Sequence, residues 1–373
     1  MAGNRRNLAR IIDSLLERRG PLLSAYLNVN AEAPENQGRA YLVRLRDAMD
    51  DLGAPEELRE RIGASLEEKT HPRARTLAIF GDADGSFEVY RLQVDLPESF
   101  RWGEPDVSPL VLALDEYEPY GAVVLDAERF RFFVVSPLAT PEAERSVKGN
   151  GFLELDIRPS EPYPRSHGSR DADPAGRTQQ ELAHRYYKEM GELARDVTFR
   201  EGVRRLILAG PQEVRSGFRE AMPGEIQDRI LAEGHVDLGA PEGELIELLE
   251  DLRKQAVFEH DKELLEEVRE NGVWGLDEVL DALQEQNRIY HLIALWDIEG
   301  EVRWCDDDSL AIQDITSEEC PFCGRKTRMR PTRDALVALG RKRGAQLDLL
   351  RGENQNTTLL REEFEGIAGL TRF

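Results

Sequence analysis

Cysteine is scarce in this chain of 373 residues, and the three that occur, Cys305, Cys320 and Cys323, all lie in its last quarter. An odd number of cysteines confined to one region argues against a disulfide framework. Long hydrophobic runs are also absent, because no stretch approaches the roughly 18 apolar residues that a helix needs to span a bilayer. The cysteines are therefore expected to bind a metal or to pack in a core, and we expect no membrane-spanning segment.

A secretion signal is missing as well. The first six residues are basic, but no apolar run follows them. Instead, apolar residues between Leu8 and Leu16 recur at helical spacing and are interrupted by charges. We therefore expect a helix here and a cytoplasmic protein.

Several catalytic motifs are not found. The chain has no phosphate-binding P-loop, no G-x-G-x-x-G after a strand, no H-E-x-x-H and no G-x-S-x-G. The six histidines are scattered along the chain and are expected to be structural. Common nucleotide-binding, zinc-protease and hydrolase sites are thus not indicated.

Positive charge is in the minority, with 49 Lys and Arg against 72 Asp and Glu and a formal net charge of −23. An acidic protein is repelled by a polyanion, so the composition argues against general nucleic-acid binding. Contact with RNA would have to use local basic patches.

Helical patterns alternate with short apolar runs, which is typical of α/β domains. The length suggests two or three domains. We predict three, each a mixed α/β layer, at residues 1–118, 119–253 and 254–373. Predicted strands cover 22–30, 76–80, 86–94, 120–126, 130–135, 205–211, 291–295 and 346–350, and predicted helices cover 39–69, 110–116, 178–197, 276–283 and 332–344.

A loop of low apolar content, within residues 158–180 of the second domain, holds a local excess of positive charge. The arginine fork suits phosphate contacts. Tyr163, Tyr186 and Tyr187 could stack on unpaired bases; alternatively the loop is simply solvated and the tyrosines pack on their own helix. The RNA-contacting residues predicted on the first interpretation are Arg158, Arg165, His167, Arg170, Arg177 and Arg185.

The cysteines suggest a metal site within an insertion at about 301–330. Cys320-Pro321-Phe322-Cys323-Gly324 is a knuckle whose two thiolates can chelate one tetrahedral Zn²⁺. Cys305 and Asp308 are the candidate remaining ligands, with Asp306, Asp307 or water as substitutes for Asp308. The predicted site is a structural zinc in a ribbon-like insertion; the alternative is a ribbon that has lost its metal and is held by packing.

Four segments resemble the three-domain class-1 release factor family of eukaryotes and archaea, which includes Pelota. Tyr120–Asp126 resembles the opening of that family's middle domain, and Arg205–Pro211 resembles a second strand of the same domain. Gly275–Leu283 resembles a helix of the third domain, and Phe364–Phe373 is similar to the closing strand. The first domain matches only in its order of strands and helices. Within the family, the chain is most similar to the bacterial and archaeal branch that includes the ribosome hibernation factor Balon.

This resemblance implies a protein that contacts ribosomal RNA of the A site and the peptidyl-transferase centre, with elongation factor Tu or another translational GTPase as a candidate partner. Release factors present Gly-Gly-Gln in the middle-domain loop, where the glycines permit unusual backbone angles and the glutamine orients the attacking water. At the matching place this chain has Gly176-Arg177-Thr178-Gln179-Gln180. Thr178 would suit the N-cap of a helix there.

Two functions follow from the resemblance. The first is a non-enzymatic factor that occupies the A site of idle or stalled ribosomes, as a hibernation factor does. The second is a peptidyl-tRNA hydrolase or rescue factor that uses Gln179 or Gln180. A weaker third, a tRNA endonuclease, has no obvious general base in this sequence.

Overall fold

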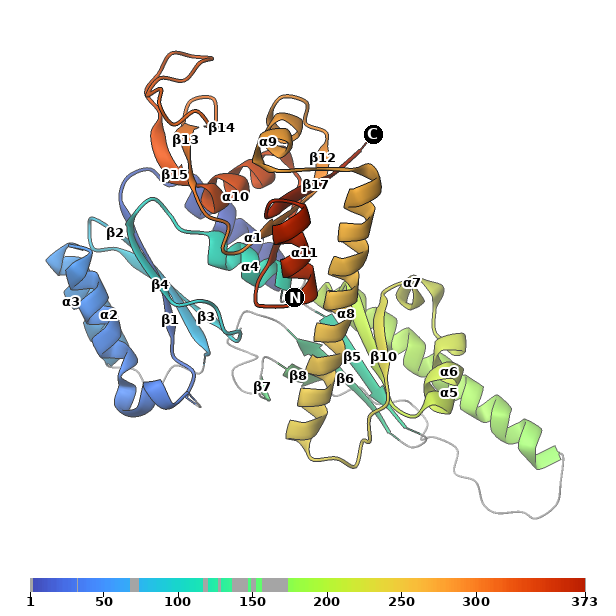
Figure 1. The fold of residues 1–373 in the computed structure, drawn as a ribbon. Helices are drawn as coiled ribbons and strands as arrows, with labels where there is room; N and C mark the ends of the chain where they lie inside the picture. Colours follow the sequence, from blue (N-terminus) through green and yellow to red (C-terminus); the bar gives the residue numbers. More distant parts are fainter. Residues whose placement is uncertain are drawn as a thin grey trace.

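The computed structural model describes residues 3–31, 33–67, 74–116, 120–126, 129–135, 147–148, 152–155 and 174–372. These residues form four β-sheets with helices packed around them, a mixed α/β fold as predicted (Figure 1). In the part of the chain thus described, no helix is both long and apolar enough to cross a membrane.

The first sheet is antiparallel and has the order β3-β2-β1-β4. Its strand β1 is buried on both faces, because Leu23 and Leu27 pack with α2 and α3 while Leu22 and Tyr26 face α1 and α4. The bounds are α1 Gly3–Leu16, β1 Leu22–Asn28, η1 Pro34–Arg39, α2 Tyr41–Asp51, α3 Glu56–Glu67, β2 Thr76–Asp82, β3 Phe87–Leu92, β4 Ser99–Gly103 and α4 Ser108–Glu116.

Strand β4 was not predicted from the sequence. It lies in a stretch with prolines at both ends, a pattern typical of a loop between two elements. Each of its residues is only half-buried, so it lacks the apolar run or clean alternation that marks a strand. It forms because β1 offers it an edge to pair with.

The second sheet is the largest, with the order β10-β9-β5-β6-β8-β7. The predicted hairpin of β5 and β6 is present, and the Asp126 carboxylate accepts a hydrogen bond from the Arg129 backbone N–H at its turn (2.7 Å). Helices α5, α6 and α7 cover one face, and the first half of α8 covers the other. The bounds are β5 Tyr120–Leu125, β6 Phe130–Val135, β7 Val147–Lys148, β8 Phe152–Leu155, α5 Pro174–Glu201, β9 Arg205–Ala209, α6 Gln212–Ala221, α7 Gly224–Gln227 and β10 Ile230–Gly234.

Helix α8 (Glu242–Asn271) continues without a break from the second sheet to the third, and the predicted boundary at 253/254 falls inside it (Figure 1). The third sheet has the order β11-β17-β12-β16, with α8 and α11 on one face and α9 and α10 on the other. The bounds are β11 Gly272–Trp274, α9 Leu276–Gln284, β12 Ile289–Leu295, α10 Thr332–Arg343, β16 Gln346–Leu350, α11 Gln355–Glu363 and β17 Ile367–Thr371.

A small fourth sheet, β14-β13-β15, forms the insertion between β12 and α10. Its strands are β13 Glu301–Cys305, β14 Leu310–Ile312 and β15 Arg328–Pro331. It stands on α10 and carries the cysteine-bearing loops away from the third sheet (Figure 1).

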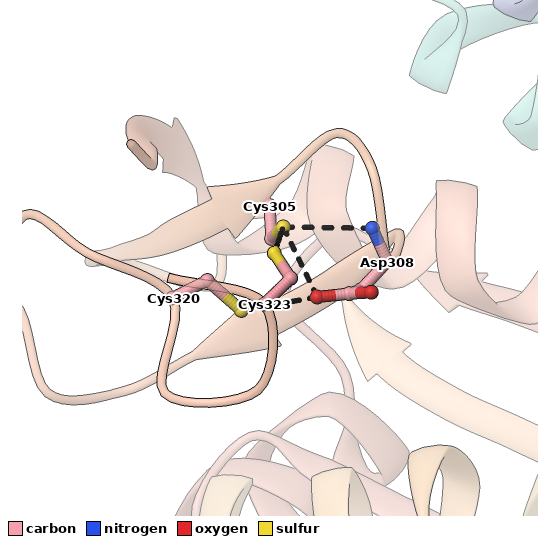
Figure 2. A group of neighbouring side chains, drawn as sticks. All are labelled: Cys305, Asp308, Cys320 and Cys323. Atoms are coloured by element: carbon pink, nitrogen blue, oxygen red, sulfur yellow. Dashed lines mark hydrogen bonds between the residues drawn. The ribbon is translucent and has the colours of Figure 1, made fainter. Parts of the chain in front are cut away.

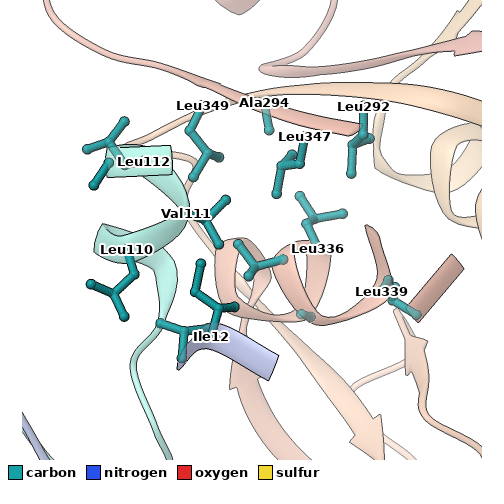
Figure 3. Packing of buried hydrophobic residues seen from close by; sticks show 14 of the residues in the cluster. Ile12, Leu110, Val111, Leu112, Leu292, Ala294, Leu336, Leu339, Leu347 and Leu349 are labelled. Atoms are coloured by element: carbon teal, nitrogen blue, oxygen red, sulfur yellow. The ribbon is translucent and has the colours of Figure 1, made fainter. Parts of the chain in front are cut away.

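The first and third sheets share one hydrophobic core. Ile12 of α1 and Leu110 and Val111 of α4 lie against Leu336 of α10 and Leu347 of β16 (Figure 3). By contrast, the core residues on both faces of the second sheet all fall within residues 120–252. The two ends of the chain are thus packed together, while the middle part has cores of its own.

Buried hydrogen bonds also join the first part of the chain to α10. The Asp334 carboxylate on α10 accepts hydrogen bonds from the Ser108 hydroxyl (2.7 Å) and from the Arg101 guanidinium. Burial opposes the charge of Asp334, but the nearby Arg101 guanidinium outweighs it and lowers the pKa of this carboxyl. A buried carboxylate needs such partners to stay ionised. The position of α10 relative to Arg101 and Ser108 is therefore fixed.

Candidate functional site

The cysteine cluster is built by two turns of the small sheet. Cys305 is the last residue of β13 and pairs with Leu310 of β14, so Asp308 lies in the tight turn between them. Cys320 and Cys323 lie on the knuckle, where the Gly324 N–H donates to the Cys320 carbonyl (2.9 Å). Gly324 has φ +70°, a left-handed conformation that glycine adopts without strain.

These turns bring the four predicted ligands together (Figure 2). Their candidate donor atoms all lie within 4.8 Å of one another. Cys305 Sγ is 3.6 Å from Cys323 Sγ and 3.5 Å from Asp308 Oδ2, and Cys320 Sγ is 3.2 Å from the same oxygen. A tetrahedral zinc with Zn–S bonds of about 2.3 Å holds two sulfurs about 3.8 Å apart and a sulfur and an oxygen about 3.5 Å apart. The cluster therefore fits a metal ion of this kind.

The alternative aspartates are turned to other partners. Asp307 pairs with Arg325 (2.7 Å), and Asp306 receives two hydrogen bonds from Arg328 (2.7 and 2.8 Å). Of the three aspartates proposed as the fourth ligand, Asp308 is the one whose carboxylate faces the sulfurs.

Hydrogen bonds join the thiols of the cluster to its carboxylate. The Asp308 carboxylate accepts hydrogen bonds from the cysteine thiols, Cys323 foremost, and these bonds lower its pKa. The same contact raises the pKa of Cys323 to about 12, and burial raises the pKa of Cys305. A metal ion would have to replace these protons, since thiolates are the ligands of zinc.

The predicted RNA-contacting residues are only partly within the described residues. Arg158, Arg165, His167 and Arg170 lie outside them, as does Tyr163. Arg177, Gln179 and Gln180 belong to α5, which starts at Pro174, four residues before the predicted start. Arg185 lies further along the same helix and is exposed.

The suggestion that Tyr186 and Tyr187 stack on bases was wrong. Both are buried, with 7% and 8% of their surface exposed. Tyr187 packs edge-to-face on Phe218 of α6, with ring centroids 6.3 Å apart. Each ring belongs to the core between α5 and the second sheet, so neither is available to a nucleotide.

A second group of buried titratable side chains was missed by the sequence analysis. His291 Nε2 lies 2.6 Å from Asp348 Oδ2, and both side chains are buried between neighbouring strands. Asp115, at the end of α4, accepts a hydrogen bond from the Leu349 backbone N–H (3.0 Å). One signal was present in the sequence, since Asp348 is an acid within the apolar strand Leu347–Leu350.

The middle part of the chain decides its relationship to other proteins. Residues 105–254 match the model of the family described as bacterial archaeo-eukaryotic release factor family 10. Over these residues the chain is similar to the bacterial archaeo-eukaryotic release factors. The matched segment contains all of the second sheet and its helices, together with α4 and the start of α8.

Other similar proteins have low sequence identity to this chain. The uncharacterized protein YocB of Bacillus subtilis (strain 168) is 24% identical over 233 residues, which are 58% of this chain and 87% of YocB. Pelota of Archaeoglobus fulgidus is 13% identical, with 99% of this chain and 92% of Pelota covered at a TM-score of 0.32. Dom34 of S. cerevisiae, a translation termination-like factor that interacts with Hbs1, is 12% identical, with coverage of 100% and 94% at a TM-score of 0.39. These TM-scores are low, so the relationship rests on the sequence match over residues 105–254.

Proposed function

We propose that this protein is a cytoplasmic translation factor that binds in the A site of idle or stalled ribosomes and does not release the nascent peptide. The family match over residues 105–254 supports action on the ribosome. The missing Gly-Gly-Gln supports the absence of release chemistry, because Gly176 is followed by arginine and neither glutamine follows a glycine pair.

The backbone at Gln179 and Gln180 carries this proposal. Both residues lie in the second turn of α5, a helix that continues to Glu201. A helical backbone is confined to one narrow range of angles, whereas a catalytic loop tip uses the freedom of consecutive glycines. A glutamine held in a helix is poorly suited to enter a narrow catalytic centre at the head of a loop.

Binding would use the arginines before and along α5. Arg185 is exposed, and no acidic partner for its side chain is found among the described residues. Together with Arg158, Arg165, His167, Arg170 and Arg177, it would supply local phosphate contacts in a chain whose net charge is −23. A translational GTPase such as elongation factor Tu would be the delivery partner.

The cysteine cluster would hold one structural zinc ion through Cys305, Asp308, Cys320 and Cys323. The metal would tie the two turns of the insertion together, which a three-stranded sheet with little core of its own needs. All four positions are occupied by protein ligands, as in structural rather than catalytic zinc sites.

Cosedimentation with ribosomes that carry peptidyl-tRNA, with binding and peptide release measured in the same samples, tests the function. We expect binding at low salt that weakens as salt is added, and no release. Arg185→Glu should weaken binding several-fold. The matched control is Arg200→Glu, an exposed arginine 15 residues further along α5 and about 22 Å away.

Two outcomes would overturn the proposal. Peptide release that disappears in Gln179→Ala or Gln180→Ala would establish the hydrolase alternative. Failure of the wild-type protein to bind ribosomes at low salt would reject both functions.

A further inference from the structure

A groove of about 740 Å³ lies between α9 and the cysteine-bearing insertion, which are neighbours at one end of the molecule (Figure 1). Much of its lining is apolar, with Leu280 from α9 and the three residues of β14. Pro321 and Phe322 of the knuckle line it as well. Concave surfaces of this size with an apolar lining are typical of binding sites.

Phe322 is the most exposed large hydrophobic residue of the described part of the chain, with 66% of its surface accessible. It lies between the two cysteines of the knuckle, whose turn is closed by the hydrogen bond from the Gly324 N–H to the Cys320 carbonyl (2.9 Å). The turn therefore holds the backbone of Phe322 in place, while its ring remains largely uncovered. An exposed aromatic ring beside a groove is typical of an anchor for a protein partner, because its burial on binding is favourable.

The α9 side of the groove is acidic. Asp277 and Asp281 of α9 and Glu285 at its C-cap line the groove, are exposed and follow one another at intervals of four residues. They therefore form one row along the helix. Within the described residues these three carboxylates form no ion pair, and of the described residues that line the groove Arg343 alone is basic. The groove thus carries a net negative charge, which complements a basic partner and repels RNA.

The edge of β14 is closed by a side chain of α9. β14 is the outer strand of the small sheet. The Ala311 backbone N–H donates to the Gln284 side-chain oxygen (2.6 Å), and the Gln284 side-chain amide donates to the Ala311 carbonyl (3.0 Å). These bonds use the groups that Ala311 would offer to an added strand. A partner would therefore bind through its side chains, as an amphipathic helix does in a hydrophobic groove.

We propose that this groove binds a basic amphipathic helix of a partner protein. Lysines or arginines of that helix would pair with Asp277, Asp281 and Glu285, and its apolar residues would cover Phe322 and the β14 side of the groove. A helix fits because acidic residues four positions apart are about 6 Å apart along α9, the same spacing as basic residues four positions apart on the partner. The proposal adds a protein partner to the proposed function and does not depend on it.

Titration of the full-length protein with a synthetic peptide tests the site. The peptide is a capped helix of lysine and leucine with its lysines four residues apart, and the control peptide has glutamate in place of lysine. We expect the lysine peptide to bind to one site and Asp281→Lys to weaken it about tenfold or more, because an attraction becomes a repulsion. Asp281 is exposed, so this substitution should leave the fold intact. Glu278→Lys is the matched control, since it makes the same charge change at an exposed position of α9 that does not line the groove.

A second pair of variants tests the apolar contact. Phe322→Ala should weaken binding of the lysine peptide about fivefold or more, because the ring would be buried at the centre of the contact. Ile315→Ala is its control, at a position of the same insertion that is 51% exposed and does not line the groove, and it should leave binding unchanged. Added salt should weaken the wild-type interaction.

Several outcomes would reject the proposal. They are no binding of the lysine peptide at millimolar concentration, equal binding of the glutamate peptide, and equal weakening by Asp281→Lys and Glu278→Lys. Self-association of the protein that is lost in Phe322→Ala, measured by sedimentation velocity, would assign the groove to a second copy of the chain instead. None of these measurements contains ribosomes, so the proposed function is tested separately.

Discussion

At the scale of single residues, the cysteine cluster depends on three thiols and one carboxylate that two short turns bring within 4.8 Å of one another. The spacing of the knuckle alone predicted two of these ligands. The choice of Asp308 over its neighbours required the structure, because arginines on β15 and the knuckle take Asp306 and Asp307.

The protein should contain about one zinc ion per chain after purification without chelators. Cys305→Ser and Cys320→Ser should lose it, because each removes a buried ligand, and the insertion should become sensitive to protease. Elemental analysis measures the metal. Asp307→Ala is the control and should keep the zinc; a metal-free wild-type protein would contradict the site.

Asp115 makes stability depend on pH. Its pKa is raised in the folded protein by burial and by Asp348, so the folded state binds the proton more tightly than the unfolded chain does. The resulting stability is complete below the ordinary carboxyl pKa of about 4 and is lost as pH rises through the folded pKa. Asp115→Asn cannot lose a proton, so its stability relative to wild type should increase between pH 4 and pH 8.

Urea unfolding of both proteins across this range measures the difference. A difference in unfolding free energy that stays constant with pH, or that falls, would show that Asp115 is ionised in the folded protein.

At the scale of elements, the turn from β9 to α6 depends on one glycine. Gly210 has φ +144°, and a Cβ there would lie 2.0 Å from the Leu125 carbonyl oxygen. Both the backbone angle and the close approach exclude a side chain. The sequence marks the end of the strand here with Gly-Pro, but the contact with β5 is visible only in the fold.

Gly210→Ala should destabilise the middle part of the chain by about 3 kcal/mol or more, since the strand and its neighbour must separate. Thermal unfolding measures the loss. Gly224→Ala should change stability by less than about 1 kcal/mol, because nothing lies within 4 Å of the added Cβ and the φ of Gly224 is not positive. Equal effects of the two substitutions would contradict the interpretation of Gly210.

At the scale of the whole molecule, the chain has two separately packed parts. The first and third sheets share a core across α1, α4, α10 and β16, whereas the middle sheet packs with its own helices. Three domains would be expected to have three separate cores. The shared core of the first and third sheets was not predicted from the sequence.

Leu336→Ala should therefore destabilise both ends of the chain by about 2–5 kcal/mol and leave the middle part unaffected. Phe218→Ala should do the opposite, with a loss of about 3–5 kcal/mol confined to the middle part. Hydrogen exchange followed by mass spectrometry resolves the three regions. Loss of protection in all regions for either variant would indicate a single cooperative unit.

The sequence by itself predicted the strands β1, β2, β5, β9, β12 and β16, the β5–β6 hairpin and the two ligands of the knuckle, because each depends on periodicity or spacing within a short segment. The tertiary structure alone decided that Tyr186 and Tyr187 are buried, that β4 pairs with β1, and that α9 and the insertion border a groove. These features depend on which faces meet across residues far apart in the chain. A local pattern shows that a helix has an apolar face, but only packing shows what covers that face.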